Sequence, residues 1–197
     1  MSKPLIYLAS GSPRRRELLT QIGVPFERIS SEVDETPLPG EGAHAYVARL
    51  AHAKALAGVA MVRQAGLPQR LLLAADTTVA LQDRILGKPV DAADAVAMLS
   101  QLSGRRHEVL TGVAVADGER VEVVVSESVV QMRELSATEI AAYVATGEPL
   151  DKAGSYGAQG LGAVLIKDLS GSFSGVVGLP LTETAALLQR FGYPFWR

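Results

Sequence analysis

The spacing of apolar positions changes repeatedly along the chain, and each change predicts a boundary between a strand and a helix. Short continuous apolar runs indicate buried strands, whereas apolar residues three and four positions apart indicate one face of a helix. The predicted strands are 4–9, 25–30, 71–76 (which continues or turns into 78–82), 107–116, 120–132, 163–168 and 173–177. The predicted helices are 13–22, 43–65, 91–103, 137–146 and 181–191.

Turn and capping residues sharpen this pattern in the middle of the chain. Asp117 and Gly118 separate two long β-branched runs, which is typical of a β-hairpin. Ser136 and Glu139 have the spacing of a capping box at the start of a helix. Strands and helices alternate before the hairpin, so we expect an α/β fold with a mixed sheet flanked by helices. At 197 residues the chain is expected to form one domain, residues 1–197.

Composition and charge remove several classes of function. Hydrophobic residues make up 48% of the chain and aromatic residues 5%, so the core is expected to consist of Ala, Leu and Val. The net charge of -2 argues against a general nucleic-acid binder, because affinity for the phosphate backbone needs an excess of Lys and Arg. The absence of cysteine excludes disulfides, thiolate zinc sites and cysteine nucleophiles. The start does not resemble a signal peptide, and no apolar block approaches the roughly 20 residues that span a bilayer. A cytoplasmic protein without membrane contact is therefore expected.

Three consecutive arginines, Arg14, Arg15 and Arg16, stand in the first turn of the helix predicted at 13–22. A helix N-terminus already carries about half a positive charge, so acidic residues rather than cations are expected there. Arg14 and Arg15 share the apolar face of this helix and point toward the carboxyl end of strand 4–9, whereas Arg16 projects to the surface. The carboxyl ends of strands are where α/β sheets commonly bind ligands.

The residues before the arginines support an anion site. Ser12 is the expected N-cap and Pro13 the first helical residue, so free N–H groups face the same place as the hydroxyls of Ser10 and Ser12. N–H groups, hydroxyls and guanidinium groups together suit a phosphate. A solvated basic turn is the ordinary explanation for a lone arginine, but the combined pattern favours phosphate binding.

Two charged residues interrupt apolar patterns. Lys54 lies in the apolar stripe of helix 43–65, and it either extends along its stem to solvent or points at a buried anion. Asp76 closes an apolar run at the end of a predicted strand, a place where α/β enzymes carry catalytic or metal-binding acids. The alternative is a purely structural role, in which the Asp76 side chain caps the turn that follows it. The functional role is favoured because Ser10 and Arg15 also follow a strand end, on what is expected to be the same rim.

Three loops carry further candidate ligands. The loop around Glu35 is acidic; such a loop is normally only solvated, but carboxylates become metal ligands where a triphosphate needs Mg²⁺. Lys88 lies in a Gly-Lys-Pro turn that lacks the Walker A spacing, and a surface lysine is the ordinary expectation there. The glycine-rich segment 154–162 is either a flexible loop or a place of close backbone approach to a ligand, with Gln159 for a base edge and Lys152 for charge.

These motifs resemble those of the Maf family of nucleotide pyrophosphatases. They occur in the family's order from Leu5 to about Leu188, nearly the whole chain. The matching segments are Ser10-Gly-Ser12-Pro-Arg14-Arg15, Glu35, Lys54, Ala75-Asp76-Thr77, Gly87-Lys88-Pro89, Asp151-Lys152-Ala-Gly154 and Gly178-Leu-Pro180. The resemblance implies a fold like that of inosine-triphosphate pyrophosphatases, with an elongated mixed sheet, two lobes and a central cleft.

The resemblance also implies a reaction and a site. Members of the family hydrolyse nucleoside triphosphates to the monophosphate and pyrophosphate with Mg²⁺ or Mn²⁺, and a homodimer is possible. Asp76 would be the catalytic residue, as a base or a metal ligand, and Glu35 and Asp76 would hold the metal. The implied substrate-binding residues are Ser10, Ser12, Arg14, Arg15, Lys54, Thr77, Lys88, Lys152 and Gln159.

Three of these positions separate two branches of the family. A branch similar to 7-methyl-GTP pyrophosphatases carries Trp in place of Arg14, Gln in place of Thr77 and Glu in place of Gln159. This chain resembles the other branch, which is associated with dTTP, UTP and modified pyrimidine nucleotides and with the cleansing of nucleotide pools. A nucleotide-binding regulator of septum formation without essential catalysis is the alternative, and a nucleotide kinase is disfavoured by the missing P-loop.

Overall fold

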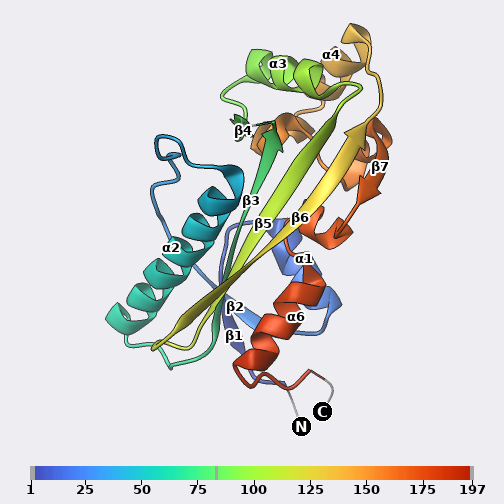
Figure 1. The fold of residues 1–197 in the computed structure, drawn as a ribbon. Coiled ribbons are helices and arrows are strands. Elements are labelled where there is room, and N and C mark those ends of the chain that lie inside the picture. Colours follow the sequence, from blue (N-terminus) through green and yellow to red (C-terminus); the bar gives the residue numbers. More distant parts are fainter. Residues whose placement is uncertain (1–2, 83, 196–197) are drawn as a thin grey trace.

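A computed structural model describes residues 3–82 and 84–195 of the chain. The described residues form a long twisted sheet of the order β2-β1-β3-β5-β6-β7, with β4 paired to β3 off this path (Figure 1). The strands are β1 Ile6–Ala9, β2 Phe26–Ile29, β3 Leu72–Leu81, β4 Arg84–Leu86, β5 Arg106–Ala116, β6 Val121–Met132 and β7 Ile166–Ser170. The helices are α1 Pro13–Gln21, α2 Ala43–Gln64, α3 Ala92–Leu102, α4 Ala137–Ala145, α5 Phe173–Val177 and α6 Leu181–Arg190. Short 3₁₀ turns between α4 and β7 are η1 Glu148–Asp151, η2 Ala153–Ser155 and η3 Gly160–Leu165.

The strand register leaves an opening along one side of β3. Strand β1 is parallel to β2 and β3, whereas the other pairs are antiparallel. Strand β1 stops where Ala9 pairs with Ala74, and along β3 the pairing with β4 starts only at Val79, which lies opposite Leu86, the last residue of β4. Residues 75–78 of β3 therefore pair with β5 alone, and their other side faces the space beyond the end of β1.

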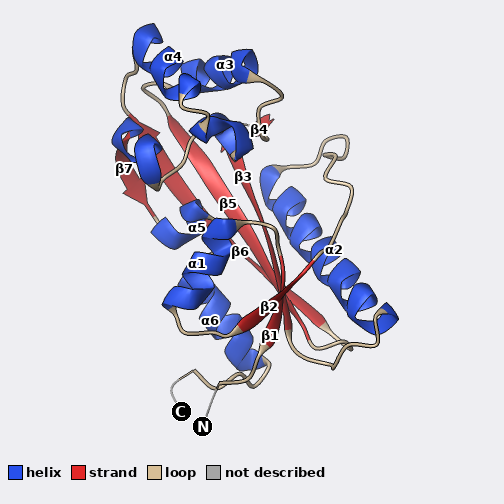
Figure 2. Cartoon of the chain, turned by 180° about the vertical axis from the view of Figure 1, so that it is seen from behind, coloured by secondary structure: helices blue, strands red, loops and turns tan. Residues whose placement is uncertain are grey.

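Helices cover both faces of the sheet around this opening. Helix α2 lies on one face, and α1 and α6 lie on the other (Figures 1 and 2). Alternation along β3 turns Leu72 toward α2 and Leu73 toward α1 and α6, because successive side chains of a strand point to opposite faces. Helix α2 approaches the sheet closely, since a Cβ on Gly112 would lie 2.5 Å from the carbonyl oxygen of Val47.

The sheet continues into a second lobe, which α3 and α4 cover (Figure 2). Leu99 of α3 and Ile140 of α4 belong to the apolar cluster that packs on the far ends of the long strands, together with Met132 of β6. The predicted capping box starts α4: the Ser136 hydroxyl accepts from the Glu139 N–H, and the Glu139 carboxylate accepts from the Ser136 N–H. Strands β3, β5 and β6 run through both lobes, so the molecule is elongated.

Two sequence predictions are wrong, namely the strand at 173–177 and the place of Asp76 at the end of a strand, and the other predicted elements are confirmed with ends moved by a few residues. The predicted strand 173–177 is helix α5, because Ser172 caps it by accepting from the Gly175 N–H at 3.0 Å and so overrides the strand preference of its valines. The predicted strand 163–168 starts later, as β7, since η3 occupies the residues before it. Of the two possibilities for 71–76, the structure has the strand continue through 78–81 as β3, so Asp76 lies within a strand and not at its end.

Candidate active site

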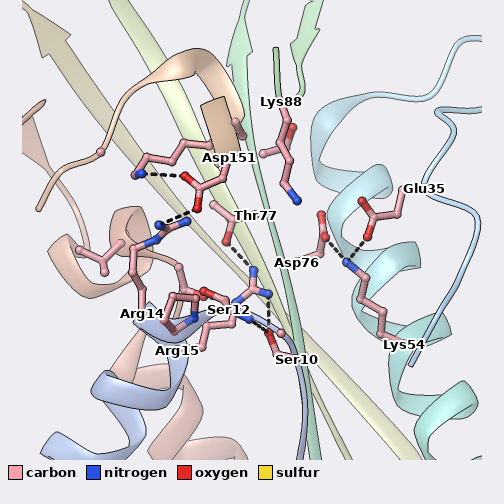
Figure 3. A pocket seen from close by; sticks show the side chains of 18 of the residues that line it. Ser10, Ser12, Arg14, Arg15, Glu35, Lys54, Asp76, Thr77, Lys88 and Asp151 are labelled. Atoms are coloured by element: carbon pink, nitrogen blue, oxygen red, sulfur yellow. Dashed lines mark hydrogen bonds and ion pairs between the residues drawn. The ribbon is translucent and has the colours of Figure 1, made fainter. Parts of the chain in front are cut away.

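The opening beside residues 75–78 leads into a cleft with a volume of about 480 Å³. The lining comes from the end of β1, the start of α1, one side of α2, the middle of β3, the turn after β4 and the segment 151–159. The charged side chains of these elements point toward one another (Figure 3). Ser10, Arg15 and Asp76, which the sequence places on one rim, all line this cleft.

Lys54 joins the two carboxylates expected to hold a metal. Its Nζ lies 2.6 Å from Asp76 Oδ1 and 2.7 Å from Glu35 Oε1 (Figure 3). The side chains of Lys54 and Asp76 are 12% and 10% exposed, whereas that of Glu35 is 51% exposed. Of the two alternatives for Lys54, the structure therefore has the ammonium directed at a buried anion. Lys54 in the apolar stripe of α2 is therefore explained by Asp76 in the apolar strand β3, because the two charges pair.

Glu35 is held as a carboxylate by the cations around it. Burial alone would raise the pKa of Glu35, but the hydrogen bond and charge of Lys54 outweigh burial, and Lys88 and Arg15 add to their effect, so that the net pKa is lowered. Tyr46 of α2 fixes the loop by donating from its hydroxyl to the Glu35 carbonyl at 2.9 Å. Burial, with the charges of Asp76 and Glu35, raises the pKa of Tyr46 to about 12, which keeps that hydroxyl a donor.

Arg15 is fixed by three acceptors from separate parts of the chain. Its Nε donates to the Gly178 carbonyl at 2.8 Å, Nη1 donates to Ser10 Oγ at 3.1 Å, and Nη2 donates to Thr77 Oγ1 at 3.1 Å. Burial lowers the pKa of the Arg15 guanidinium, Asp76 opposes this shift, and Arg14 reinforces it. The second arginine of the triplet is thus a partly buried, oriented cation at the N-terminus of α1.

Thr77 is held in turn by a neighbour on β5. Thr77 and Thr111 face each other in the strand register, and their hydroxyl oxygens lie 2.8 Å apart. Thr111 donates to the Gly175 carbonyl at 2.8 Å, so Thr77 is the donor to Thr111 and the acceptor from Arg15. The Thr77 hydroxyl is therefore engaged on both sides, and the chain of bonds runs from α5 through two strands to Arg15.

Arg14 meets the other lobe through Asp151. Arg14 Nη1 lies 3.6 Å from Asp151 Oδ2, and Lys152 Nζ lies 2.7 Å from Asp151 Oδ1. Lys152 also donates to the Glu148 carbonyl at 2.5 Å, so its ammonium is bound to protein acceptors. Burial by itself would raise the pKa of Asp151, but the bond and charge of Lys152 and the charge of Arg14 lower it overall.

The remaining candidate ligands line the cleft without a side-chain bond among the described residues. Ser12 occupies the N-cap position of α1, but its hydroxyl makes no capping bond, and its N–H donates to Ser10 Oγ at 3.2 Å. Lys88 and Gln159 are exposed on the cleft wall. Arg16 does not line the cleft, which agrees with its expected place outside the site.

The glycines of segment 154–162 lie close to other protein groups, which neither a flexible loop nor close approach to a ligand would predict. A Cβ on Gly154 would lie 2.8 Å from a methyl of Val79, and a Cβ on Gly157 would lie 2.9 Å from Lys152 Cε. This segment packs tightly on the side chains beneath it. Asp151, Tyr46 and Thr111 have no signal in the sequence that predicts their roles, because the residues that they contact are distant in sequence.

Glu35 and Asp76 fit a divalent cation that arrives with phosphate. The described residues contain no group of three or more His, Asp or Glu side chains that could hold a metal ion alone. Mg²⁺ commonly takes one or two carboxylates and fills its other positions with substrate phosphates and water. Each carboxylate uses one oxygen for Lys54 in the described structure, and the second oxygen of each, Oε2 of Glu35 and Oδ2 of Asp76, makes no other bond there.

Within the residues described, no helix is both long and apolar enough to cross a membrane. The fold resembles that of the Ham1 protein of Staphylococcus aureus, with a TM-score of 0.50 and 15% identity over 95% of this chain and 97% of that chain. This likeness concerns the fold alone. It confirms the expected α/β architecture, with its mixed sheet, two lobes and cleft.

Sequence comparison places the chain among proteins of one kind. A dTTP/UTP pyrophosphatase of Aromatoleum aromaticum is 55% identical over 198 residues, which cover 96% of each chain. Another of Dechloromonas aromatica is 53% identical over 95% of this chain and 98% of the relative. A family model described as Maf-like protein matches residues 5–191. With the model and the relatives matched over almost the entire length, the chain belongs to the Maf family.

Proposed function

We propose that this protein hydrolyses nucleoside triphosphates, chiefly dTTP, UTP and modified pyrimidine nucleotides, to the monophosphate and pyrophosphate. The observation that carries this proposal is the largely buried Lys54 side chain, 12% exposed, between Asp76 and Glu35 and in the same cleft as Arg15. The relatives named dTTP/UTP pyrophosphatase support the same reaction. Removal of noncanonical nucleotides from the cellular pool is the proposed role.

The cations of the cleft are proposed to bind the triphosphate. Arg14 and Arg15 from α1 and Lys88 from the turn after β4 line the same cleft, so a polyanion bound there is proposed to contact all three. Arg15 uses three N–H groups for protein acceptors, and a guanidinium has five, which leaves donors for a phosphate. The hydroxyls of Ser10 and Ser12 and the N-terminus of α1 add donors at the same place.

Asp76 is proposed to prepare the attacking water. Its carboxylate would accept the water proton as the oxygen bonds to the α-phosphorus, and the bond from the α-phosphorus to the bridging oxygen would break to release pyrophosphate. Lys54 keeps Asp76 oriented by its 2.6 Å contact. When bound by Glu35 and Asp76, Mg²⁺ or Mn²⁺ would neutralise charge on the phosphate oxygens. Phosphoryl transfer depends mostly on such positioning and charge neutralisation.

The nucleoside is proposed to lie toward Gln159 and Lys152. Gln159 offers both a donor and an acceptor to a base edge. Thr77 is proposed to act through Arg15, because its hydroxyl is bound to Arg15 and Thr111. Cytoplasmic location, a homodimer, a single domain and the absence of nucleic-acid partners stay predictions from the sequence and the resemblance.

A nucleotide-binding regulator without catalysis is not favoured. Binding alone does not need Asp76 and Glu35 beside the phosphate cations, where two carboxylates weaken the affinity for an anion. The relatives are also named as enzymes.

The proposed reaction is tested by incubating the protein with Mg²⁺ and a panel of nucleoside triphosphates, and by measuring pyrophosphate and orthophosphate separately. Pyrophosphate release, fastest with dTTP or UTP, is the expected result. Orthophosphate as the main product would indicate a different reaction, and no product with any nucleotide would favour the regulator.

A further inference from the structure

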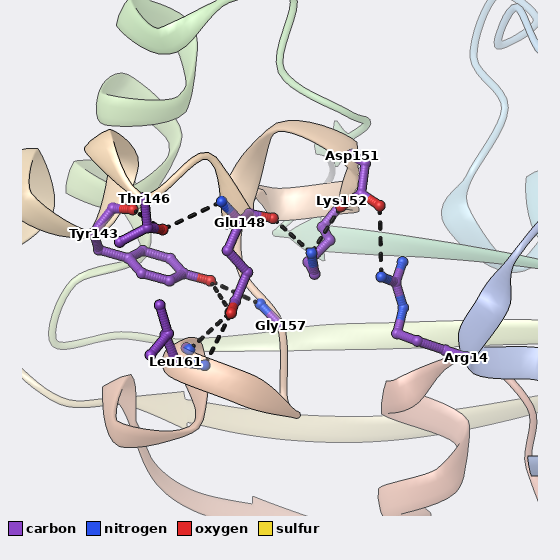
Figure 4. A network of polar contacts seen from close by, with 9 residues as sticks. Arg14, Tyr143, Thr146, Glu148, Asp151, Lys152, Gly157 and Leu161 are labelled. Carbon is purple, nitrogen blue, oxygen red and sulfur yellow. Dashed lines mark hydrogen bonds and ion pairs between the residues drawn. The ribbon is translucent and has the colours of Figure 1, made fainter. Parts of the chain in front are cut away.

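A second polar network lies behind the cleft wall that carries Gln159, at the junction of α4, η1 and η3 (Figure 4). Its centre is Glu148, whose carboxylate accepts from the N–H groups of Leu161 and Gly162, both at 2.9 Å. These N–H groups stand in the first turn of η3, where no backbone partner is available to them. Glu148 therefore binds the chain on the C-terminal side of Gln159.

Tyr143 binds the chain on the other side of Gln159. Its hydroxyl accepts from the Gly157 N–H at 3.2 Å and donates to Glu148 Oε1 at 2.9 Å. Burial raises the pKa of Tyr143, so the hydroxyl keeps its proton for this donation. The segment 157–162, which we call the Gln159 loop, is thus fixed at both ends by one hydrogen-bonded pair of side chains.

The glycines of the Gln159 loop are explained by this pair. A Cβ on Gly160 would lie 2.7 Å from Glu148 Oε2, and a Cβ on Gly162 would lie 2.5 Å from Tyr143 Oη. Any larger side chain at these positions would displace the carboxylate or the hydroxyl. The loop and its two supports therefore fit each other closely.

The same network reaches Arg14. Lys152 donates to the carbonyl of Glu148 and to the carboxylate of Asp151, and Asp151 faces Arg14 across the cleft. Burial would raise the pKa of Glu148, but the N–H groups of Leu161 and Gly162, the Tyr143 hydroxyl and Lys152 lower it overall, so Glu148 is charged. Two of the positions that separate the family branches, Arg14 and Gln159, are thereby connected through Glu148.

We propose that Glu148 and Tyr143 are positioning residues for base selection: they hold the Gln159 loop where Gln159 meets the nucleobase. The proposal rests on the proposed pyrophosphatase function. Neither side chain lines the cleft, so each acts through the loop and not by touching the substrate.

The test compares E148Q and Y143F with matched variants. E139Q removes the same charge from another carboxylate that accepts a backbone N–H, that of Ser136 in the capping box of α4, outside the cleft lining. Y193F removes the hydroxyl of another buried tyrosine, one with no hydrogen-bond partner among the described residues. Melting temperatures show whether each variant folds.

Two measurements are made on these four variants. In the ratio of kcat/KM for dTTP to that for dGTP, we expect a decrease of about tenfold in E148Q and Y143F, because lost positioning weakens base discrimination. We also expect the amides of Leu161 and Gly162 to exchange with deuterium about tenfold faster in E148Q, because the carboxylate that accepts from both of them is replaced by a weaker acceptor. E139Q and Y193F are expected to change neither quantity.

Several results would overturn the proposal. An unchanged dTTP to dGTP ratio in both variants would do so, as would an equal loss of turnover on both nucleotides, which indicates a merely structural role. Unchanged amide exchange in E148Q would show that Glu148 does not hold the loop. Failure of the wild-type protein to release pyrophosphate from any nucleotide would instead refute the proposed function, and faster amide exchange in E148Q would still support the anchoring of the loop.

Discussion

The two walls of the cleft hold their polar groups by different means. The wall of β1, α1, α2 and β3 consists of regular elements with apolar cores on both faces of the sheet, and its charges face one another directly, as Lys54 and Asp76 do. The opposite wall, from η1 to η3, consists of short turns, and its shape depends on side chains that bind backbone groups. The regular elements of the first wall therefore hold its charged groups in fixed positions, whereas the shape of the second wall depends on a few side-chain bonds to the backbone.

The largest effect is expected from D76N on the first wall. Asn keeps the shape of the side chain but removes the base and the charge opposite Lys54, so pyrophosphate release should fall by about 10³-fold, within the usual range for loss of a catalytic acid or base. The KM for dTTP should change little. D168N on the exposed surface of β7 is the control. Turnover close to wild type in a folded D76N protein would remove Asp76 from the mechanism.

The stability of the protein should depend on pH through His107 of β5, which contacts Tyr156 in the second wall. His107 and Tyr156 are in contact, with 2.7 Å between Nε2 and the hydroxyl, and Tyr156 lines the cleft. Burial lowers the pKa of His107 to about 4 from 6.5, so the unfolded chain takes up a proton that the native state does not. The stability that neutral His107 gives is present above pH 6.5 and is lost as the pH falls toward 4.

This loss should amount to about 3 kcal/mol in the free energy of unfolding. H107Q does not titrate there, so its unfolding free energy, measured with urea at a series of pH values, should fall less steeply than that of wild type. H44Q, which changes a largely exposed histidine, should follow wild type. Equal slopes for H107Q and H44Q would contradict the assignment.

R15K tests whether the first wall needs geometry as well as charge. Lys keeps the positive charge but cannot reach the Gly178 carbonyl, Ser10 and Thr77 together, so we expect the KM for dTTP to rise by about tenfold to a hundredfold. R16K, one residue further along α1 and outside the cleft lining, should leave the KM unchanged. A KM in R15K equal to that in R16K would mean that charge alone suffices.

The smallest effect is expected from T111V, which touches the first wall only indirectly. Valine cannot donate to the Gly175 carbonyl or accept from Thr77, so the unfolding free energy should decrease by about 1 to 2 kcal/mol and the KM should rise a few-fold. T184V removes a buried hydroxyl that has no partner among the described residues, and it should be near neutral. A T111V protein as active and stable as T184V would show that Arg15 does not depend on this chain of bonds.

Much of the fold follows from the sequence, because local physics decides it. Apolar spacing predicts the long helix α2 and the β5–β6 hairpin, and the capping box predicts the start of α4. Helix α5 shows the limit of that reasoning, since a Ser172 cap outweighs the β-branched residues that follow it. Cleft-lining residues such as Ser10, Arg15, Lys54 and Asp76 are also identifiable in the sequence, because each departs from the pattern around it.

Only the tertiary structure decides how these residues act on one another. The direction of Lys54 follows from the carboxylates that reach it from β3 and from the Glu35 loop. Asp76 lies within a strand and still lines the cleft, because β1 pairs with β3 only as far as Ala74 and β4 pairs with β3 only from Val79 onward. Strand register places Thr111 opposite Thr77, and Glu148 is set against the Gln159 loop by contacts between separate turns. Such contacts depend on the register and closure of the whole sheet, which the spacing of residues within one segment does not encode.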